Sequence, residues 1–324
     1  MKILVTGGAG YIGSALVERL ISLGHEVKVI DDLSNGFIEN INQKAEYLNG
    51  SILNDELLSR AIKDVEAVFH LAAKIRVEEG EVKPDLYRQV NVDGTLNLLK
   101  LCNSLGVKKF IFASTAAVYG DPSDYPVSEE SQTKPVNVYG RTKLEIDEYL
   151  SKSAKSLGIS AISFRFFNVG GAVQNSKQGW LKIKHEGATH LIPSILRSSE
   201  ATPLLIYGND WPTSDGTPVR DFVHLSDLID ALVGSLNCLE NPGHEIINLG
   251  TAKGSTVLEV IQAANVALKR EINYKFAPRR AGDSFALVTS SRKARELLNW
   301  NPLRNLINIL EDANKELNTN RKVL

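Results

Sequence analysis

The sequence predicts an α/β fold, in which a Rossmann-type doubly wound parallel sheet is joined to a smaller α/β lobe. Three observations support this prediction. Short β-branched segments alternate with longer segments of helical periodicity through the first half, as in a parallel sheet covered by helices on both faces. A glycine-rich turn follows the first β-branched segment directly. The 324 residues also exceed the usual length of one domain.

The first half supplies the elements of the predicted sheet. The expected strands are Ile3–Thr6, Glu26–Asp31, Ala67–Leu71, Phe110–Ser114 and Ser160–Phe166. The expected helices between them are Tyr11–Leu23, Asp55–Ile62, Pro84–Leu105 and Tyr139–Leu157. A glycine directly follows the first, third and fourth of these helices, at a position where a left-handed C-cap forms easily.

The character of the sequence changes after Asn168. Long loops rich in Gly, Pro, Ser and Asn alternate there with short helices and strands, which indicates a second lobe. We therefore expect a first domain over residues 1–168 and a second over residues 169–324. The segment Ser226–Cys238 has the pattern of a helix that covers a sheet, so residues 221–240 are expected to return to the first domain.

Composition narrows the partners and the location of the chain. The 37 basic and 38 acidic residues give a net charge of −1, so we expect no nucleic-acid or membrane partner. Cys102 and Cys238 lie far apart and no histidines pair at metal-ligand spacing, so no metal site is expected. The longest uncharged apolar-rich run, Phe110–Tyr119, is about half of a spanning helix. With no leader at Met1–Gly7, we expect a reduced, cytoplasmic location.

The turn after the first strand has the features of an anion cradle. It reads Gly7-Gly8-Ala9-Gly10-Tyr11-Ile12-Gly13 and opens the first predicted helix, so backbone without side chains lies beside free helical N–H groups. Asp31 and Asp32 end the second strand, where a carboxylate suits the hydroxyls of an adenosine ribose. No arginine follows them to meet a 2′-phosphate, which favours NAD over NADP. A purely structural turn and a capping aspartate are the alternatives.

A tyrosine and a lysine form the candidate catalytic pair. Tyr139 and Lys143 lie four residues apart in a predicted helix and therefore share one face, although this spacing is common by chance. The hydroxyls of Ser114 and Thr115 follow a strand, at the sheet edge where ligands of open α/β sheets bind. For a tyrosine to act as a base, its pKa of about 10 must fall by about 3 units, and a nearby ammonium and a cationic nicotinamide favour that fall. The alternative is a packed tyrosine beside a solvated lysine.

With these motifs the chain resembles the extended short-chain dehydrogenase/reductase superfamily and, within it, the NAD-dependent epimerase/dehydratase family. The resemblance covers essentially the whole chain. It rests on the glycine turn, on the tyrosine, lysine and threonine just described, and on two segments of the second lobe. These segments, Tyr207–His224 and Ala277–Asp283, are similar to those of UDP-hexose 4-epimerases.

The resemblance implies an isomerase with tightly bound NAD that interconverts UDP-galactose and UDP-glucose through a transient 4-keto sugar. The implied catalytic residues are Thr115, Tyr139 and Lys143. The implied cofactor-binding residues are Gly7, Gly10, Tyr11, Ile12, Gly13, Asp31, Asp32, Asn35, Ser51, Ile52, Leu71, Ala72, Ala73, Asn91, Ser114, Tyr139, Lys143 and Phe167. The implied substrate-binding residues are Thr115, Tyr139, Asn168, His190, Leu191, Leu205, Tyr207, Arg220, Arg280 and Asp283.

Two further features accompany that resemblance. The guanidinium group of an arginine can donate two parallel hydrogen bonds to phosphate oxygens. We therefore expect a basic spot sized for one diphosphate, formed by Arg220, Arg279 and Arg280. The resemblance also implies a homodimer, with Pro84–Leu105 and Tyr139–Leu157 as candidate interface helices.

Several positions depart from the family pattern or separate its members. Sugar-nucleotide 4,6-dehydratases need an acid and a base after the active-site threonine, where this chain has Ala116 and Ala117, so dehydration is disfavoured. Ser51 replaces an aspartate near adenine, and Ile75 replaces a lysine near the cofactor phosphate. Leu287 replaces a bulky tyrosine of the sugar pocket, which leaves two interpretations open: a pocket that admits UDP-N-acetylhexosamines, or a leucine of the core. A dehydrogenase and a non-catalytic NAD-binding regulator are the other function classes.

Overall fold

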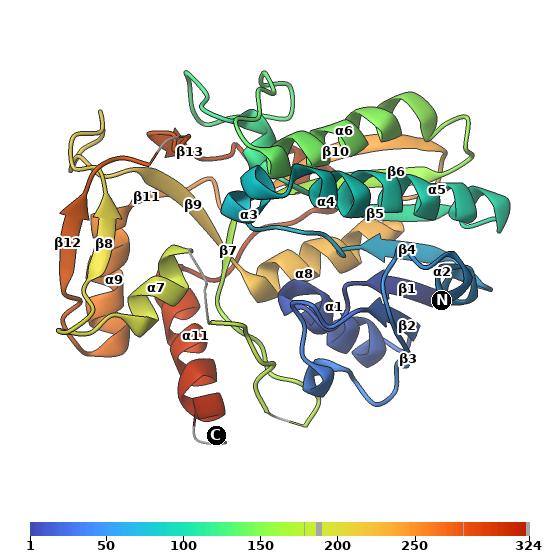
Figure 1. Ribbon diagram of the computed structural model, residues 1–324, viewed down its shortest axis with the longest axis horizontal. Helices are drawn as coiled ribbons and strands as arrows, with labels where there is room; N and C mark the ends of the chain where they lie inside the picture. The colour runs from blue at the N-terminus through green and yellow to red at the C-terminus, as the bar shows by residue number, and fades with distance from the viewer. Residues whose placement is uncertain (178, 186–189, 281, 322–324) are drawn as a thin grey trace.

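The computed structural model describes residues 1–177, 179–185, 190–280 and 282–321. It has two lobes, a larger one around a central sheet and a smaller one that holds much of the yellow-to-red part of the chain (Figure 1). The chain runs between the lobes more than once, because α8 and β10 lie with the larger lobe although the segments on either side of them belong to the smaller one.

The larger lobe is built on a seven-stranded parallel sheet in the order β10-β6-β5-β4-β1-β2-β3. Helices cover both of its faces, which confirms the predicted α/β, doubly wound architecture. Buried Val, Ile and Phe side chains dominate the central strands, as expected for a sheet with no solvated face. The strands are β1 (Lys2–Thr6), β2 (Glu26–Asp31), β3 (Glu46–Asn49), β4 (Ala67–His70), β5 (Lys109–Thr115), β6 (Ser160–Phe166) and β10 (Gly243–Leu249).

Alternate side chains of each strand pack against different helices. Ile3 and Val5 of β1 join the apolar cluster that contains α1 and α8, whereas Leu4 joins the cluster of α2, α5 and α6 on the other face. The helices of this lobe are α1 (Tyr11–Ser22), α2 (Asp55–Ile62), α3 (Val77–Val82), α4 (Pro84–Arg88), α5 (Gly94–Ser104), α6 (Val138–Ser153) and α8 (Leu225–Gly234). Short helical turns add Ile38–Asn40, Ala116–Tyr119 and Ser235–Asn237.

The structure differs from the sequence-based expectation in several elements. The strands β3 and β10 were not predicted. The predicted helix Pro84–Leu105 is interrupted, because a π-helical turn at Gln89–Asp93 joins α4 to α5. The predicted helix Tyr139–Leu157 ends earlier, at Ser153, and continues as a turn up to the left-handed Gly158.

The smaller lobe combines short strands with three packed helices. A four-stranded sheet is formed by β7 (Asn168–Gly170), β9 (Val219–His224), β11 (Gly254–Thr256) and β13 (Ala286–Leu287), and a two-stranded sheet by β8 (Leu204–Tyr207) and β12 (Tyr274–Ala277). Its apolar core lies among α7 (Leu191–Arg197), α9 (Val257–Leu268) and α11 (Leu306–Arg321), while α10 (Arg292–Leu298) packs near β10.

The division at residue 168 stays a prediction, and the packing suggests how the return segment runs. α8 packs against α1, and β10 forms the edge strand beside β6. β9, in contrast, pairs with β7, β11 and β13 of the smaller lobe. We therefore propose that the return to the larger lobe extends over residues 225–249, in place of 221–240.

Within the described residues, no helix has the length and apolarity needed to cross a bilayer. Both cysteines carry free thiols, and burial raises the pKa of Cys102 to about 12, so this thiol is inert at neutral pH.

Candidate active site

The predicted cofactor and catalytic residues gather at one edge of the large sheet. Parallel strands bring their carboxyl ends to the same edge, where ligands of open α/β sheets bind. Accordingly the glycine turn follows β1, Asp31 ends β2, Leu71 follows β4, Thr115 ends β5 and Phe167 follows β6. The candidate site therefore lies at this edge.

The glycine turn is tight enough to require glycine at several positions. Gly7 has a φ of +73°, and a Cβ there would lie 2.8 Å from the backbone nitrogen of Ala72. A Cβ on Gly13 would overlap the carbonyl oxygen of Gly7. The helix α1 begins after Gly10 with no side chain capping it, so its first N–H groups are open to an anion. These features fit the pyrophosphate of a dinucleotide.

The two predicted ribose carboxylates differ in their surroundings. Asp31 is buried, and it accepts hydrogen bonds from the backbone N–H of Ala9 (2.9 Å) and of Leu33 (2.8 Å). Burial raises the pKa of Asp31, and these two N–H donors oppose that rise. Asp32 is exposed and accepts from the Ser34 N–H. Asp31 thus ties the glycine turn to the loop that carries the half-buried Asn35.

The segment after β4 is held by buried side chains. The amide of Asn91 accepts from the Lys74 N–H (2.8 Å) and donates to the Lys74 carbonyl (2.9 Å) and to Thr142 (3.1 Å). Asn91 lies in the π-helical turn, a feature often found at functional sites. The hydroxyl oxygen of Thr6 accepts from the N–H groups of Leu71 and Ala72. These contacts fix the backbone of the predicted cofactor segment Leu71–Ala73.

The positions where the chain departs from the family pattern are also visible. Ser51 is half-buried and its hydroxyl oxygen accepts from the Leu53 N–H at 3.2 Å. Its neighbour Ile52 is a core residue that packs over Gly94. Ile75 is 48% exposed and therefore contributes an apolar side chain to the surface beside Lys74.

The predicted catalytic side chains lie together where β5 meets α6. Asn137 caps α6 by accepting from the Gly140 N–H, which places Tyr139 in the first turn. Lys143 is 2% exposed, and its ammonium donates to the carbonyl of Ala113 at 2.7 Å. The same nitrogen lies 4.6 Å from the Phe112 ring centroid and 6.0 Å from that of Tyr139.

The electrostatics of this pair differ from the expectation of a lowered tyrosine pKa. Burial raises the pKa of Tyr139 to about 12, and a hydrogen bond with Thr115 opposes that rise. Burial lowers the pKa of Lys143 to about 7, and the charge of Asp147 opposes that fall. Without a bound ligand, the protein therefore leaves Tyr139 protonated. Activation of this tyrosine requires Lys143 in its charged form and, in addition, the charge of a bound cationic group.

On the smaller lobe, the two arginines predicted to bind substrate make different contacts. Arg220, on β9, is partly buried, donates to the Val219 carbonyl and lies 4.0 Å from the carboxylate of Asp283. The guanidinium carbon of Arg280 lies 3.6 Å from the ring centroid of Tyr207, which places these two predicted substrate residues face to face.

Arg279, the third arginine of the predicted basic spot, has partners within the protein. It forms an ion pair with Asp210 at 2.7 Å and its guanidinium lies 4.1 Å from the Trp211 ring centroid. We therefore propose that the diphosphate is held mainly by Arg220 and Arg280.

The remaining predicted substrate residues are spread over the smaller lobe. Asn168 begins β7, and Leu191 begins α7 directly after the exposed His190. Leu205 is 48% exposed on β8. Leu287 lies opposite Arg220 in the pairing of β13 with β9 and also packs against the apolar cluster of Phe167, so both interpretations of this leucine have a contact that supports them.

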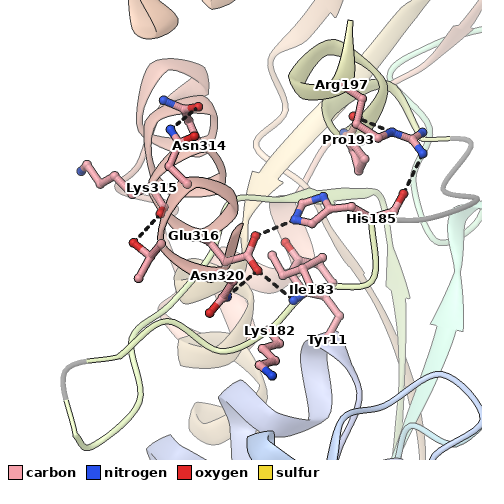
Figure 2. A network of polar contacts seen from close by, with 12 residues as sticks. Tyr11, Lys182, Ile183, His185, Pro193, Arg197, Asn314, Lys315, Glu316 and Asn320 are labelled. Atoms are coloured by element: carbon pink, nitrogen blue, oxygen red, sulfur yellow. Dashed lines mark hydrogen bonds and ion pairs between the residues drawn. The ribbon is translucent and has the colours of Figure 1, made fainter. Parts of the chain in front are cut away.

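A polar network centred on a buried carboxylate joins the C-terminal helix α11 to the segment Leu181–His185 (Figure 2). We call the segment Leu181–His185 the strap. Glu316 of α11 is 1% exposed and accepts from the Ile183 N–H (3.0 Å) and from the His185 imidazole (2.6 Å). The strap is therefore held to the smaller lobe by the Glu316 carboxylate and by Arg197 of α7, which donates to the His185 carbonyl at 2.8 Å.

The other side of the strap is fastened to the larger lobe. Asn40 accepts from the Lys182 N–H and donates to the carbonyls of Lys182 and Ala9, so one amide connects the strap to the glycine turn. Tyr11, in that turn, donates to the Gly171 carbonyl at 2.7 Å. Burial raises the pKa of Tyr11, and the charge of Glu316 raises it further.

Sequence reasoning missed the residues that support the site from a distance. Glu316 follows the apolar positions Leu310 and Ala313 and precedes Leu317, so a carboxylate on the apolar face of a helix was the available signal. Asp147, four residues after Lys143 on α6, gave a similar signal. The partners of both carboxylates come from distant segments, which no local pattern reveals.

Comparison with known proteins agrees with this arrangement. Residues 3–250 match the model of the NAD dependent epimerase/dehydratase family. The UDP-glucose 4-epimerase of Corynebacterium glutamicum is 40% identical over 318 residues, covering 97% of this chain and 94% of that protein. That of Lactobacillus helveticus is 40% identical over 307 residues, covering 93% and 92%.

Solved structures are similar over the same extent. The UDP-glucose 4-epimerase from Stenotrophomonas maltophila, crystallised with NAD and a formylated UDP-arabinopyranose, superposes with a TM-score of 0.94 at 30% identity and full coverage of both chains. A UDP-Glc/GlcNAc 4-epimerase from Campylobacter jejuni superposes with a TM-score of 0.84 at 34% identity, covering 97% of this chain and 98% of that one.

Proposed function

The chain belongs to the NAD dependent epimerase/dehydratase family, and from this premise we propose that it interconverts UDP-galactose and UDP-glucose by inverting C4 of the hexose. One observation carries the proposal. Thr115, Tyr139 and Lys143 meet at the carboxyl edge of the large sheet. The chain that carries them is similar over nearly its full length to UDP-glucose 4-epimerases.

The residues at the sheet edge fit NAD. The open N–H groups of α1 and the crowded glycine turn suit a pyrophosphate, and the carboxylates of Asp31 and Asp32 suit ribose hydroxyls. Bound NAD supplies the acceptor and donor of the hydride. We propose that Ser114, Tyr139 and Lys143 border the nicotinamide half, where β5 ends.

The protein's own contribution to the chemistry is the movement of one proton. We propose that Tyr139, as phenolate, takes the proton of the sugar O4 while Thr115 donates a hydrogen bond to the same oxygen. Lys143 stabilises the phenolate by its charge. The 4-keto sugar then turns about its diphosphate linkage, the hydride returns to the opposite face of C4, and Tyr139 gives its proton back to O4.

Rotation of the sugar requires an anchor on UDP rather than on the hexose. We propose that Arg220 and Arg280 hold the diphosphate, that Tyr207 packs near the uracil, and that Asp283 binds a ribose hydroxyl. Thr115 is followed by Ala116 and Ala117, which carry no proton, so elimination of water has no acid or base at that place.

A coupled assay from UDP-galactose to UDP-glucose tests this function. Wild-type protein is expected to turn over UDP-galactose, and Tyr139→Phe is expected to lower kcat by about 10²–10⁴-fold with KM within about twofold. Equal activity of the two proteins would contradict the proposed base. Turnover by the purified protein without added NAD separates an epimerase from a dehydrogenase that releases its reduced cofactor.

A second candidate function is epimerisation of UDP-N-acetylglucosamine, alone or in addition. Leu287 favours it, because it lies opposite Arg220 where a bulky tyrosine would narrow the sugar pocket. Wild-type protein would then turn over UDP-N-acetylglucosamine, and Leu287→Tyr would lose this activity while keeping that on UDP-galactose. No turnover of the N-acetylated substrate by wild type would reject the candidate.

We also propose a cytoplasmic homodimer. Two free cysteines suit a reduced compartment. α4 and α6 lie side by side, and both residues of the Arg88–Glu145 ion pair across them are exposed, so this helical surface is uncovered and available to a second copy. Mass measurement in solution tests the dimer, and a mass of 35.5 kDa would exclude it.

A further inference from the structure

A buried carboxylate lies behind the catalytic pair. Tyr139, Lys143 and Asp147 follow one another at intervals of four residues on α6, so all three lie along one face of the helix. Asp147 is 1% exposed, which is rare for an aspartate unless it is paired. The proposed mechanism uses the first two of these residues and leaves the third without a role.

The partners of Asp147 keep it ionised. One of its oxygens accepts from Arg165 Nε and from the Ser114 hydroxyl, both at 3.0 Å. Arg165 also donates to Tyr119, which donates to Asn248, so the arginine is held in place from two sides. Burial raises the pKa of Asp147, but an ion pair of this geometry with an arginine favours the carboxylate at neutral pH.

The second oxygen of Asp147 is buried and makes no hydrogen bond within the described residues, although the nearby Ser163 hydroxyl helps to lower the pKa of the carboxyl. The described residues show no direct ion pair between Asp147 and Lys143, so the carboxylate acts on the ammonium through space, by its charge. Of the charged groups around Lys143, Asp147 is the one whose charge favours the ammonium. His70, facing from β4, is neutral because burial and the lysine charge hold its pKa at about 3. Arg165 lies behind Asp147, on β6.

Tyr139 and Lys143 compete for one proton. When the pair has lost a single proton, it is either phenolate with ammonium or phenol with neutral amine, and only the first form is a base for the sugar hydroxyl. Burial opposes both charges, so without a further charge the uncharged form, phenol with neutral amine, is favoured. Together with the bound cationic group, a negative charge beside the lysine shifts the balance toward the first form. It acts weakly on Tyr139 itself, which is two helical turns, or about 12 Å along the axis, away.

We propose that Asp147 is a positioning residue that keeps the proton on Lys143, so that Tyr139 is the group that gives its proton up. This inference rests on the proposed role of Tyr139 as the base. It assigns to Asp147 an effect on the reaction that is separate from its ion pair with Arg165.

The test uses the NAD-loaded protein and the near-ultraviolet absorbance of tyrosinate as pH is raised. Asp147→Asn keeps the size of the side chain and both neighbours while removing the charge. The part of the tyrosinate signal that comes from Tyr139 is the part that Tyr139→Phe abolishes. At about pH 8 this part is expected to be smaller in Asp147→Asn than in wild type. The kcat is expected to fall about tenfold with KM within about twofold, as for a shift of about one unit in the pKa of Tyr139.

Two control variants separate this effect from loss of structure. Asp147→Glu keeps the charge and is expected to restore the tyrosinate signal. Arg165→Lys keeps both charges but disturbs the ion pair, and is expected to leave the signal in place even if it lowers the melting temperature. If Asp147→Asn does not fold, Asp147→Asn combined with Arg165→Met, which removes both members of the ion pair and leaves neither charge unpaired, is expected to lower the signal in the same direction.

The outcomes distinguish this inference from the proposed function. A wild-type protein without any signal that depends on Tyr139 overturns the role of the tyrosine and the inference together. A signal that is present in wild type and unchanged in Asp147→Asn overturns the inference alone. An equal loss in Arg165→Lys and Asp147→Asn assigns Asp147 a merely structural role and also overturns it.

Discussion

Two helical glycines of this protein occupy opposite environments. Gly13 is the third residue of α1, and a Cβ there would overlap the Gly7 carbonyl and lie 2.8 Å from the Gly8 Cα. Gly234 ends α8 with helical backbone angles, and a Cβ there would have no neighbouring atom within 4 Å. The same substitution therefore has opposite effects at the two sites.

We expect Gly13→Ala to lower the free energy of unfolding by about 2–4 kcal/mol and to abolish NAD retention, because the turn must open to admit the methyl group. Gly234→Ala is expected to raise the free energy of unfolding by up to about 1 kcal/mol, because alanine loses less backbone entropy than glycine when the helix forms. Urea unfolding and the NAD content of the purified proteins measure both effects. Retained NAD in Gly13→Ala would contradict the assignment of the turn.

Lys143 is a residue that the proposed function requires and stability does not. Burial lowers its pKa from 10.5 to about 7. Between these two values the unfolded chain binds more protons at this site than the folded chain does, so the stability contribution of this group rises with pH across that window. The lysine therefore destabilises the fold most below about pH 7.

Accordingly, Lys143→Met is expected to raise the free energy of unfolding of the cofactor-free protein by about 1–3 kcal/mol at about pH 6. The gain should shrink toward pH 10, and activity should fall by at least about 10²-fold. Urea unfolding at both pH values checks this. A variant that is less stable than wild type at the lower pH would show that the lysine is compensated more fully than its burial indicates.

At the scale of elements, one buried carboxylate joins the strap to α11. Glu316→Gln keeps the side-chain size but weakens the bonds to Ile183 and His185, and we expect it to cost about 2–4 kcal/mol of unfolding free energy. Lys315→Ala, on the exposed face of the same helix, is a matched control with an expected effect below about 0.5 kcal/mol. Equal effects in urea unfolding would contradict a specific role of Glu316.

The elements also show which parts of the fold the sequence predicts. β1 and β2 were predicted to within a residue because each is a short run of buried β-branched residues next to a turn. β3 has one buried residue, and the first half of β10 is half-buried or exposed and includes a glycine, a histidine and a glutamate, so neither has a periodicity that distinguishes it from a loop. Their position in the sheet is determined by pairing with distant strands.

The same distinction applies to the site. The glycine turn and the spacing of Tyr139 and Lys143 are local, so the sequence alone predicts where they lie. The ion pair of Arg165 with Asp147 and the contact of Glu316 with the strap join distant segments, and only the folded chain brings them together. The motif predicts Arg279 at the diphosphate but gives no sign of its ion pair with Asp210, 69 residues earlier in the chain.

At the scale of the whole molecule, the lobes are interleaved. α8 and β10 belong to the packing of the larger lobe, while β9 and α9, which flank them in sequence, belong to the smaller one. Neither lobe is therefore completed by one continuous segment. Interleaving of this kind makes the unfolding of one lobe remove elements from the other.

We therefore expect a single cooperative transition in calorimetry of the NAD-loaded protein. UDP at about 100 times its Kd should raise the free energy of unfolding by about 2.7 kcal/mol. The midpoint temperature of the whole transition should rise with it, although the proposed contacts of UDP lie on the smaller lobe. Two resolved transitions, only one of which moves with UDP, would show that the lobes unfold independently.

The order of the elements along the chain also bears on how the protein is made. A ribosome releases β1 to β6 well before β10 and α11, so during synthesis the edge of β6 has no neighbour and the strap has no Glu316 to hold it. An unpaired strand edge favours association with other chains. The nascent protein thus passes through a period in which it needs protection at that edge, and the strap cannot be held beside the glycine turn by Glu316 until α11 has emerged.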